Sequence, residues 1–319
     1  MAVYTEISKD DLDSLLENYD ISEINKFTGI KEGVENSNYL LENNDSKFIL
    51  TIFEKRTNED DLPFFFKLMN HLEHSGIKCP QVIQDSSGKL YNYIKNKPVV
   101  LTSFLEGHSL KKINPKHCGE LGENLARFHL SSDKLNIKRE NSLGIKHLNR
   151  LVTEVNSFKS DVPENLLETI NNEYNYLKDK LPISLPSGII HADLFPDNVF
   201  FTNDKLSGII DFYFACNDYF AYEIAICLNA WCFERNNEFN VSKAMLFLKK
   251  YNSIRKISIE ELEALPTLAR AAGLRFLLTR LYDKLNHNKE DLVSAKDPLE
   301  YYEKLKFHQS VKNVSEYGL

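Results

Sequence analysis

The chain reads Ile-Ile-His-Ala-Asp-Leu-Phe-Pro-Asp-Asn-Val-Phe-Phe at residues 189–201 and Gly-Ile-Ile-Asp-Phe at residues 208–212. Apolar runs lie on both sides of a polar loop, and the second run ends at an aspartate. The runs are typical of buried strands. The pattern therefore predicts a loop carrying Asp193 and Asn198 beside a strand that presents Asp211.

These three side chains match the needs of phosphoryl transfer to a hydroxyl group. Such a reaction needs a carboxylate that orients the attacking hydroxyl and accepts its proton. It also needs an amide oxygen and a second carboxylate to hold the Mg²⁺ that bridges the phosphates of ATP. Asp193 fits the first role, and Asn198 and Asp211 fit the second. An aspartate beside a proline-containing loop can also be a turn former, but the joint pattern favours catalysis.

The spacing His-x-Asp-x-x-x-x-Asn, followed by an apolar run ending in Asp, resembles the catalytic core of the aminoglycoside phosphotransferase and choline kinase superfamily. Further segments are similar to the homoserine kinases of that superfamily: residues 29–39, 48–56, 61–65, 274–280 and 316–318. The resemblance covers nearly the whole chain.

The resemblance implies a bilobal, protein-kinase-like α+β fold. We expect a small β-rich lobe over residues 1–105, which covers the nucleotide, and a larger, mainly helical lobe over residues 106–319. It further implies ATP and Mg²⁺ as cofactors, L-homoserine as the small-molecule acceptor, and O-phospho-L-homoserine for threonine biosynthesis as the product.

A polar turn near the start of the chain is the candidate for phosphate contacts. It contains Gly33, Asn36, Ser37 and Asn38. Glycine and asparagine tolerate positive φ, so backbone amides here can point toward a phosphate. Alone, the turn fits an ordinary hairpin better than a phosphate-binding loop. Its place before the Asp193 loop makes it the expected nucleotide-covering loop.

The strand expected at residues 48–53 departs from the kinase pattern. Kinases carry a lysine here that contacts the phosphates and pairs with a glutamate of the next helix. By alignment Thr51 occupies the lysine position, and Lys55 is the nearest candidate replacement. No glutamate stands at the expected helix position, because Glu59 and Asp60 precede the helix. The ion pair is therefore either replaced or absent.

A second β-rich run, residues 98–104, is expected to end the small lobe. In a bilobal kinase, backbone groups between Ser103 and Leu105 would then contact the adenine edge. The same run also fits a core strand that ends in a turn, and the two interpretations are compatible.

Several charged residues near the core allow two interpretations. Asp218 and Glu223 fit a structural role that ties a helix to the catalytic loop, and His191 fits a scaffold for that loop. Either acid, Glu223 first, is also a candidate for the substrate ammonium. Arg275 is a candidate for the substrate carboxylate, with Asp193 contacting the hydroxyl. Arg270 and Arg280 are alternatives for the carboxylate, although surface or structural salt bridges fit each arginine too.

Composition limits the function classes. The 319 residues carry a formal net charge of −7, which argues against a nucleic-acid partner. The most apolar segment, residues 219–233, is too short to span a membrane. Five cysteines without a Cys-x-x-Cys pair predict buried free thiols in the cytoplasm rather than disulfides or a zinc site. The sequence makes no prediction of the oligomeric state.

Helical spacing of apolar residues predicts several long helices, with a loop at residues 132–150. Ser8 and Asp11 resemble a capping box at the start of the first helix. A helix is expected over residues 259–285, with Pro266 interrupting it.

Two other functions stay open from the sequence. A related kinase would act on choline, ethanolamine, an aminoglycoside or another small alcohol. Choline would call for an aromatic cage, for which Trp231, Tyr219 and Tyr222 are candidates. The remote alternative is a nucleotide-binding protein without catalysis, suggested by the missing lysine–glutamate pair.

Overall fold

The structure, a computed structural model, describes residues 4–30, 36–54, 57–287 and 295–319. The chain divides into two compact units. Among the described residues, the first unit contains those up to Glu106 together with Gly208–Tyr213, and the second contains the rest. Gly33 and Lys55 lie outside the described residues. The six residues 208–213, which the sequence interpretation assigned to the second lobe, belong to the first unit.

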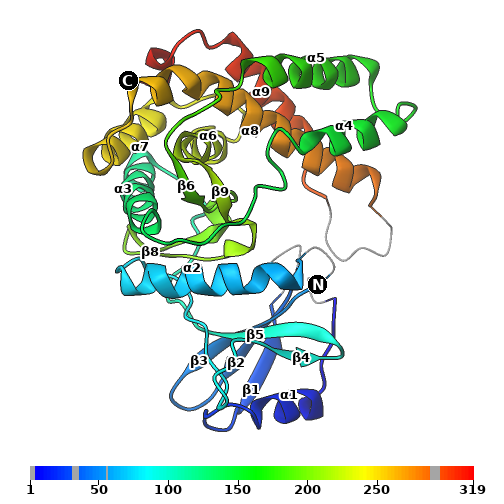
Figure 1. The fold of residues 1–319 in the computed structure, drawn as a ribbon, viewed down its shortest axis with the longest axis vertical. Coiled ribbons are helices and arrows are strands. Elements are labelled where there is room, and N and C mark those ends of the chain that lie inside the picture. The colour runs from blue at the N-terminus through cyan, green and yellow to red at the C-terminus, as the bar shows by residue number, and fades with distance from the viewer. Residues whose placement is uncertain (1–3, 31–35, 55–56, 288–294) are drawn as a thin grey trace. The chain divides into compact units, whose positions relative to one another are not determined.

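The first unit is built on a five-stranded antiparallel sheet with the strand order β1-β2-β3-β5-β4 (Figure 1). The strands are β1 (Lys26–Gly29), β2 (Ser37–Glu42), β3 (Lys47–Ile52), β4 (Asn92–Ile94) and β5 (Lys97–Ser103). Ser37 is opposite Ile52, and Ile52 is opposite Val99. The start of β2, the end of β3 and the start of β5 therefore meet at one end of the sheet.

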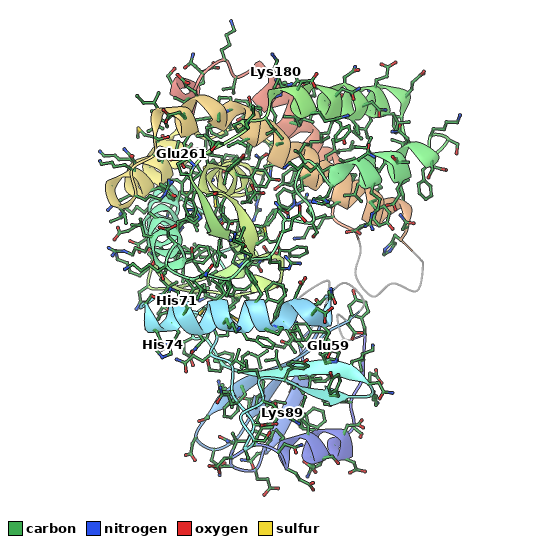
Figure 2. The ribbon with its side chains drawn as sticks, viewed as in Figure 1. Glu59, His71, His74, Lys89, Lys180 and Glu261 are labelled. Carbon is green, nitrogen blue, oxygen red and sulfur yellow. The ribbon has the colours of Figure 1, made fainter. Side chains whose placement is uncertain are left out.

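Two helices complete this unit, α1 (Lys9–Leu16) and α2 (Leu62–His74). The predicted capping box is present: the Ser8 hydroxyl accepts from the Asp11 amide, and the Asp11 carboxylate accepts from the Ser8 amide. Helix α2 follows a 3₁₀ turn, Glu59–Asp61, and carries Pro63 in its first turn, where no helical amide is required. Glu59, at the start of that turn, is labelled in Figure 2.

The second unit is mainly helical. Its helices are α3 (Pro115–Ser132), α4 (Leu148–Ser157), α5 (Glu164–Lys180), α6 (Phe220–Trp231), α7 (Val241–Ile254), α8 (Ile259–Leu285) and α9 (Leu299–Ser310). Helix α8 packs against α6 and α9 (Figure 1). Helix α6 is buried on nearly every side, as its apolar sequence predicts. None of the described helices combines the length and apolar character that crossing a membrane requires.

Two short strand pairs carry the segments around the catalytic stretch. β6 (Ser187–Ile190) pairs antiparallel with β9 (Cys216–Tyr219), and β7 (Val199–Thr202) pairs with β8 (Lys205–Ile209). Ile189 and Ile190 are buried, which explains why the apolar run before His191 forms a strand. Three short 3₁₀ segments complete the assignment: Pro196–Asn198, Phe212–Phe214 and Val314–Tyr317.

Two helix predictions were wrong in detail. Pro266 lies inside α8 and does not interrupt it. A proline removes one helical hydrogen bond, but Leu265 and Leu268 are buried on either side of it, and this burial holds the helix together. Helix α4 begins at Leu148, inside the predicted loop.

All five cysteines are buried and free, as predicted. Burial raises the pKa of the Cys79 and Cys216 thiols to about 12, so both stay protonated near neutral pH.

Candidate active site

The catalytic loop begins where β6 ends and runs from His191 to Phe195 before the 3₁₀ turn Pro196–Asn198. His191 and Ala192 are buried, and Asp193 is partly exposed. The indole Nε1 of Trp231 donates to the Leu194 carbonyl at 2.8 Å. A side-chain hydrogen bond from helix α6 thus holds the loop at Leu194.

The structure brings Asp193 and Asn198 together, as the sequence predicts. Asn198 Nδ2 donates to the Asp193 carbonyl at 2.8 Å and to Asp193 Oδ2 at 3.2 Å. Because both bonds use the amide nitrogen, the amide oxygen of Asn198 is directed away from the Asp193 main chain. That oxygen is a hard donor of the type that Mg²⁺ prefers.

His191 supports the loop from within. Its Nδ1 accepts a hydrogen bond from the Asp193 amide at 3.3 Å, and its side chain is fully buried. This geometry agrees with a scaffold role for His191.

Ala192 is the most constrained residue of the loop. Its φ of 63° lies in the left-handed region, which is unfavourable for a residue with a Cβ. Glu223 accepts hydrogen bonds from the amides of His191 at 2.6 Å and Ala192 at 2.7 Å. Arg275 Nη1 donates to the Ala192 carbonyl at 2.7 Å. The two charged side chains fix both sides of this strained peptide.

Glu223 and Arg275 are the two residues that the sequence interpretation assigned to substrate contacts. Glu223 is 0% exposed and Arg275 is 1% exposed. Both Glu223 oxygens and Arg275 Nη1 are engaged with backbone groups of the catalytic loop. Their geometry supports a positioning role in place of direct contact with a substrate.

A buried polar chain continues behind Glu223. His129 Nε2 lies 3.3 Å from Glu223 Oε2, and His129 Nδ1 lies 2.6 Å from the Tyr251 hydroxyl. Arg255 Nη1 donates to the Tyr251 hydroxyl at 3.3 Å and pairs with Glu261 at 3.0 Å. Burial lowers the pKa of His129, although Glu223 opposes this shift. His129 is therefore a hydrogen-bonded part of the core.

Asp218 lies on β9 in the same unit. Its carboxylate accepts from Asn141 Nδ2 at 2.6 Å and from the Tyr219 amide at 2.7 Å. Burial raises its pKa. This bonding ties β9 to the Asn141 loop, which fits the structural role predicted for Asp218.

Asp211 belongs to the first unit, whereas Asp193 and Asn198 belong to the second. It directly follows the apolar run after β8 and has a φ of 64°, in the left-handed region. Its neighbour Tyr213 packs edge-on against Phe53 at 4.9 Å and Phe65 at 5.6 Å between ring centroids. Burial, and next the charge of Asp211, raise the pKa of the Tyr213 phenol. These ring contacts fix the segment that carries Asp211 within its unit.

The predicted phosphate-loop residues Asn36, Ser37 and Asn38 lie at one end of the five-stranded sheet. Thr51 Oγ1 donates to Asn38 Oδ1 at 2.7 Å, and the Glu54 amide donates to Asn36 Oδ1 at 3.2 Å. The Ser37 hydroxyl donates to Glu54 Oε1 at 2.7 Å. The three side chains are thus hydrogen-bonded to Thr51 of β3 and to Glu54, which follows that strand.

A lysine–glutamate ion pair stands at this end of the sheet, between Lys97 and Glu54. Thr5 Oγ1 also donates to Glu54, at 2.7 Å, and Lys97 Nζ lies 2.6 Å from Thr5 Oγ1. The sequence interpretation missed this pair, because its members lie 43 residues apart on different strands. Hydroxyl and lysine hydrogen bonds outweigh burial and lower the pKa of Glu54.

Glu59, which precedes α2, does not supply the expected helix glutamate. Its carboxylate accepts hydrogen bonds from the hydroxyls of Tyr91, at 3.1 Å, and Tyr93. Within the described part of the first unit, the ion pair between Lys97 and Glu54 is therefore the lysine–glutamate contact nearest the end of β3.

Ser103 and Leu105, the predicted adenine contacts, lie at the end of β5 and just after it. The Ser103 amide donates to the Gln81 carbonyl at 2.8 Å, and the Gln81 amide donates to Ser103 Oγ at 2.9 Å. Leu105 packs so closely on Gly208 that a Cβ there would lie 2.4 Å from Leu105 Cδ2. A larger residue at position 208 would require the Leu105 side chain to move.

A family model described as "Phosphotransferase enzyme family" matches residues 26–256, which is more than half of the chain. A homoserine kinase of Sinorhizobium fredii is 49% identical over 319 residues, covering 100% of this chain and 98% of that protein. A homoserine kinase of Agrobacterium fabrum is also 49% identical over 319 residues, covering 100% and 99%.

Solved structures share the fold at low sequence identity. An amicoumacin kinase in complex with AMP-PNP, Ca²⁺ and Ami superposes with a TM-score of 0.73 at 16% identity, covering 97% of this chain and 95% of that chain. A choline kinase from Cryptosporidium parvum superposes with a TM-score of 0.69 at 14% identity, covering 95% and 94%. These similarities confirm the predicted kinase-like α+β fold.

Proposed function

The chain belongs to the phosphotransferase enzyme family, and on this premise we propose that it is a kinase that transfers the γ-phosphate of ATP to L-homoserine. The observation that carries the acceptor identity is 49% identity to homoserine kinases over the full length of the chain. The product would be O-phospho-L-homoserine, a precursor of threonine. We propose the cytoplasm, where ATP is available and thiols stay reduced, as its compartment.

Asp193 is the proposed catalytic residue. Its carboxylate orients the acceptor hydroxyl and takes its proton as the hydroxyl oxygen bonds to the γ-phosphorus. The bond from the γ-phosphorus to the β,γ-bridging oxygen breaks, and ADP leaves. A positioned base of this kind contributes about 10²–10⁴-fold in rate. The hydrogen bond from Asn198 Nδ2 to Asp193 Oδ2 supports this role, because it holds the carboxylate in one orientation.

Asn198 and Asp211 are the proposed ligands of Mg²⁺. An amide oxygen and a carboxylate form a hard oxygen donor set that fits this ion. When bound, Mg²⁺ would neutralise charge on the ATP phosphates. The amide orientation of Asn198 supports the assignment, since its nitrogen is already used by Asp193. No three His, Cys, Asp or Glu side chains in the described ranges form a separate metal cluster.

The nucleotide contacts are proposed as predicted from the sequence. Asn36, Ser37 and Asn38, with Gly33 and Lys55, would serve the phosphates, and the backbone from Ser103 to Leu105 would serve the adenine. The anchoring of Asn36 and Ser37 by Glu54 supports the first assignment. The structure of the amicoumacin kinase holds AMP-PNP, which supports nucleotide use in this fold.

For the acceptor, Asp193 contacts the hydroxyl, while Glu223 and Arg275 act through the catalytic loop. Both were candidates for direct substrate contact. Their complete burial and their bonds to Ala192 support positioning.

Acceptor-dependent ADP release tests the function. The assay contains ATP and Mg²⁺ with L-homoserine, D-homoserine, L-serine, choline, ethanolamine or kanamycin, one at a time. We expect strong preference for L-homoserine. A preference for another alcohol would keep the chemistry of Asp193 and discard the acceptor. No ADP with any acceptor would support the non-catalytic alternative.

The choline alternative finds little support in the candidate cage. Trp231 and Tyr222 are 1% and 4% exposed, and Trp231 Nε1 is bonded to the Leu194 carbonyl. The Tyr219 hydroxyl donates to the carbonyls of Pro182 and Ile183. Trp231 and Tyr222 are therefore part of the core, and Tyr219 holds the loop at Pro182 and Ile183.

A further inference from the structure

The three arginines of α8 have different partners. Arg270 holds Glu173 of α5 with two hydrogen bonds, from Nε at 2.6 Å and from Nη2 at 2.7 Å. Arg275 holds the Ala192 carbonyl. Arg280 instead meets the start of α9, where Nη1 donates to Glu300 Oε2 at 2.6 Å and to the Asp297 carbonyl at 3.2 Å. Toward the described residues, both hydrogen bonds of Arg280 come from Nη1, so its Nε and Nη2 are not used by these contacts and can hold a further anion.

Arg280 belongs to a cluster with an excess of positive charge. Lys304 Nζ lies 2.5 Å from Glu300 Oε1, so two cations share one carboxylate. The side chains of Arg280 and Lys304 are 11% and 5% exposed, while that of Glu300 is 39% exposed. Burial lowers the pKa of Lys304, against the effect of Glu300. A second anion at this place would relieve the uncompensated charge.

Tyr301 lies within the same cluster. The Arg280 guanidinium lies 4.4 Å and the Lys304 ammonium 4.6 Å from the Tyr301 ring centroid. The Tyr301 side chain is 0% exposed, and its hydroxyl has no hydrogen-bond partner among the described residues. A buried hydroxyl without a hydrogen-bond partner costs free energy. The Tyr301 hydroxyl is therefore suited to donate a hydrogen bond to a bound ligand.

The cluster adjoins the catalytic loop within the second unit. The Tyr301 ring packs on Phe276 at 5.2 Å and on Phe195 at 6.4 Å between centroids. Phe195 donates its amide to the Asp193 carbonyl at 2.8 Å. Lys296, just before α9, pairs with Asp197 of the loop at 3.3 Å. These contacts place the Tyr301 ring against Phe195, a residue of the loop that carries Asp193.

We propose that Arg280, Lys304 and the Tyr301 hydroxyl form the subsite for the carboxylate of an α-amino-acid acceptor. Arginine holds a carboxylate with two parallel hydrogen bonds, and the hydroxyl donates a third. The subsite makes the enzyme select acceptors with a carboxylate a few atoms from the hydroxyl that is phosphorylated. This inference rests on the proposed function, since it names how L-homoserine is recognised.

Specificity for a carboxylate can be measured directly. The kcat/KM values of L-homoserine and 3-amino-1-propanol, which lacks only the carboxylate, are compared in wild type, Arg280→Met and Tyr301→Phe. A site built to bond a polar group rejects analogues without that group by large factors. We expect Arg280→Met to lower kcat/KM for L-homoserine about 10²-fold, chiefly through KM, and to leave 3-amino-1-propanol within about 3-fold. Tyr301→Phe should have a smaller effect, about 10-fold.

Arg270→Met is the matched control, because Arg270 lies on the same helix and loses an equally close ion pair with Glu173. It should keep the preference of the wild type. An Arg280→Met enzyme that is folded and retains the wild-type KM for L-homoserine overturns the proposal. So does an equal loss for both acceptors, which would mean that the cluster only stabilises the fold.

A binding measurement separates this inference from the proposed function. L-2-aminobutyrate keeps the carboxylate and lacks the hydroxyl, so calorimetry reports its binding without turnover. We expect Arg280→Met to weaken this binding about 10²-fold and Arg270→Met to leave it unchanged. If wild type fails to phosphorylate L-homoserine, the proposed function is lost, and the calorimetric comparison still decides whether the carboxylate subsite exists.

Discussion

Arg275 donates a hydrogen bond of 2.7 Å to the carbonyl of Ala192, a residue whose backbone lies in the left-handed region at φ 63°. Left-handed alanine is unfavourable, so the surrounding contacts must hold it. Glu223 bonds the two amides on the other side of the peptide. The direction of Asp193, the next residue, is therefore set by two buried charges from α6 and α8.

Arg275→Met should reduce kcat about 10²-fold while the KM for L-homoserine changes less than about 3-fold. The substitution leaves the Ala192 carbonyl unpaired and lets Asp193 move. It should also lower the free energy of unfolding by about 1–3 kcal/mol. Steady-state kinetics and urea unfolding measure both effects. A large rise in KM with unchanged kcat would instead support direct binding of the substrate carboxylate.

Asp193→Asn should lower kcat by about 10²–10⁴-fold, because the amide cannot accept the hydroxyl proton. ATP binding, measured by calorimetry, should survive. Asp197→Asn is a matched control in the same loop, since the Asp197 side chain is 61% exposed and pairs with Lys296. Full activity of Asp193→Asn would rule out the proposed base.

Asp211→Asn should raise the Mg²⁺ concentration needed for half-maximal activity by about 10-fold or more, because a carboxylate ligand is replaced by a neutral amide. The comparison is a Mg²⁺ titration of activity at saturating ATP. Asp204→Asn, at an aspartate whose side chain is 78% exposed, should titrate like the wild type. If both variants require the same Mg²⁺ concentration, Asp211 is not a metal ligand.

The Lys97–Glu54 pair should show measurable coupling. In a double-mutant cycle of Lys97→Met and Glu54→Gln, we expect a coupling free energy of about 1 kcal/mol, since Glu54 also accepts from Ser37 and Thr5. The KM for ATP should rise in each single variant, and the KM for L-homoserine should not.

The control cycle uses Lys26 and Glu42, which pair at 3.0 Å across β1 and β2 with side chains 67% and 24% exposed. Exposed pairs of this kind contribute about 0.2–1 kcal/mol. Equal coupling free energies in both cycles, with an unchanged KM for ATP, would show that Lys97 and Glu54 form an ordinary surface ion pair without a role in ATP binding.

Stability should fall as the pH drops from about 6.5 toward 3. Burial lowers the pKa of His308 to about 3, and its Nδ1 lies 2.8 Å from the Tyr317 hydroxyl. In the unfolded chain the same imidazole has a pKa near 6.5. The unfolded state therefore binds more protons in this window. The contribution of His308 to the free energy of unfolding is fully present above the window and is lost as the pH falls through it.

The His308→Gln variant should reduce this pH dependence by up to about 1.4 kcal/mol per pH unit within the window. Urea unfolding at several pH values provides the measurement. His74→Gln, at a side chain that is 71% exposed, is the control and should leave the slope unchanged. Identical slopes in wild type and His308→Gln would show that His308 is not protonated on unfolding in this range.

The sequence predicted the features that depend on contacts between residues close together in the chain. The Ser8–Asp11 capping box and the long helices follow from residues three or four apart. The Asp193–Asn198 contact also lies within five residues. Pro266 shows the limit, because burial along α8 by distant helices overrides the local preference of proline.

The contacts missed from the sequence join distant residues. Lys97 meets Glu54 over 43 residues, and Arg270 meets Glu173 over 97. Nothing in the spacing of α8 distinguishes Arg270, Arg275 and Arg280. Their partners depend on which segment lies beside each arginine, a helix for Arg270 and Arg280 and the catalytic loop for Arg275, and only the tertiary structure sets this.

The Arg275–Ala192 bond spans 83 residues of chain, and this separation has a consequence for synthesis. A ribosome adds about 5–20 residues per second, so the catalytic loop leaves it roughly 4–17 s before Arg275 is made. During that interval Ala192 has no guanidinium to hold it, and the strained peptide can relax. We therefore expect the chain to reach full activity only after helix α8 has joined the folded protein.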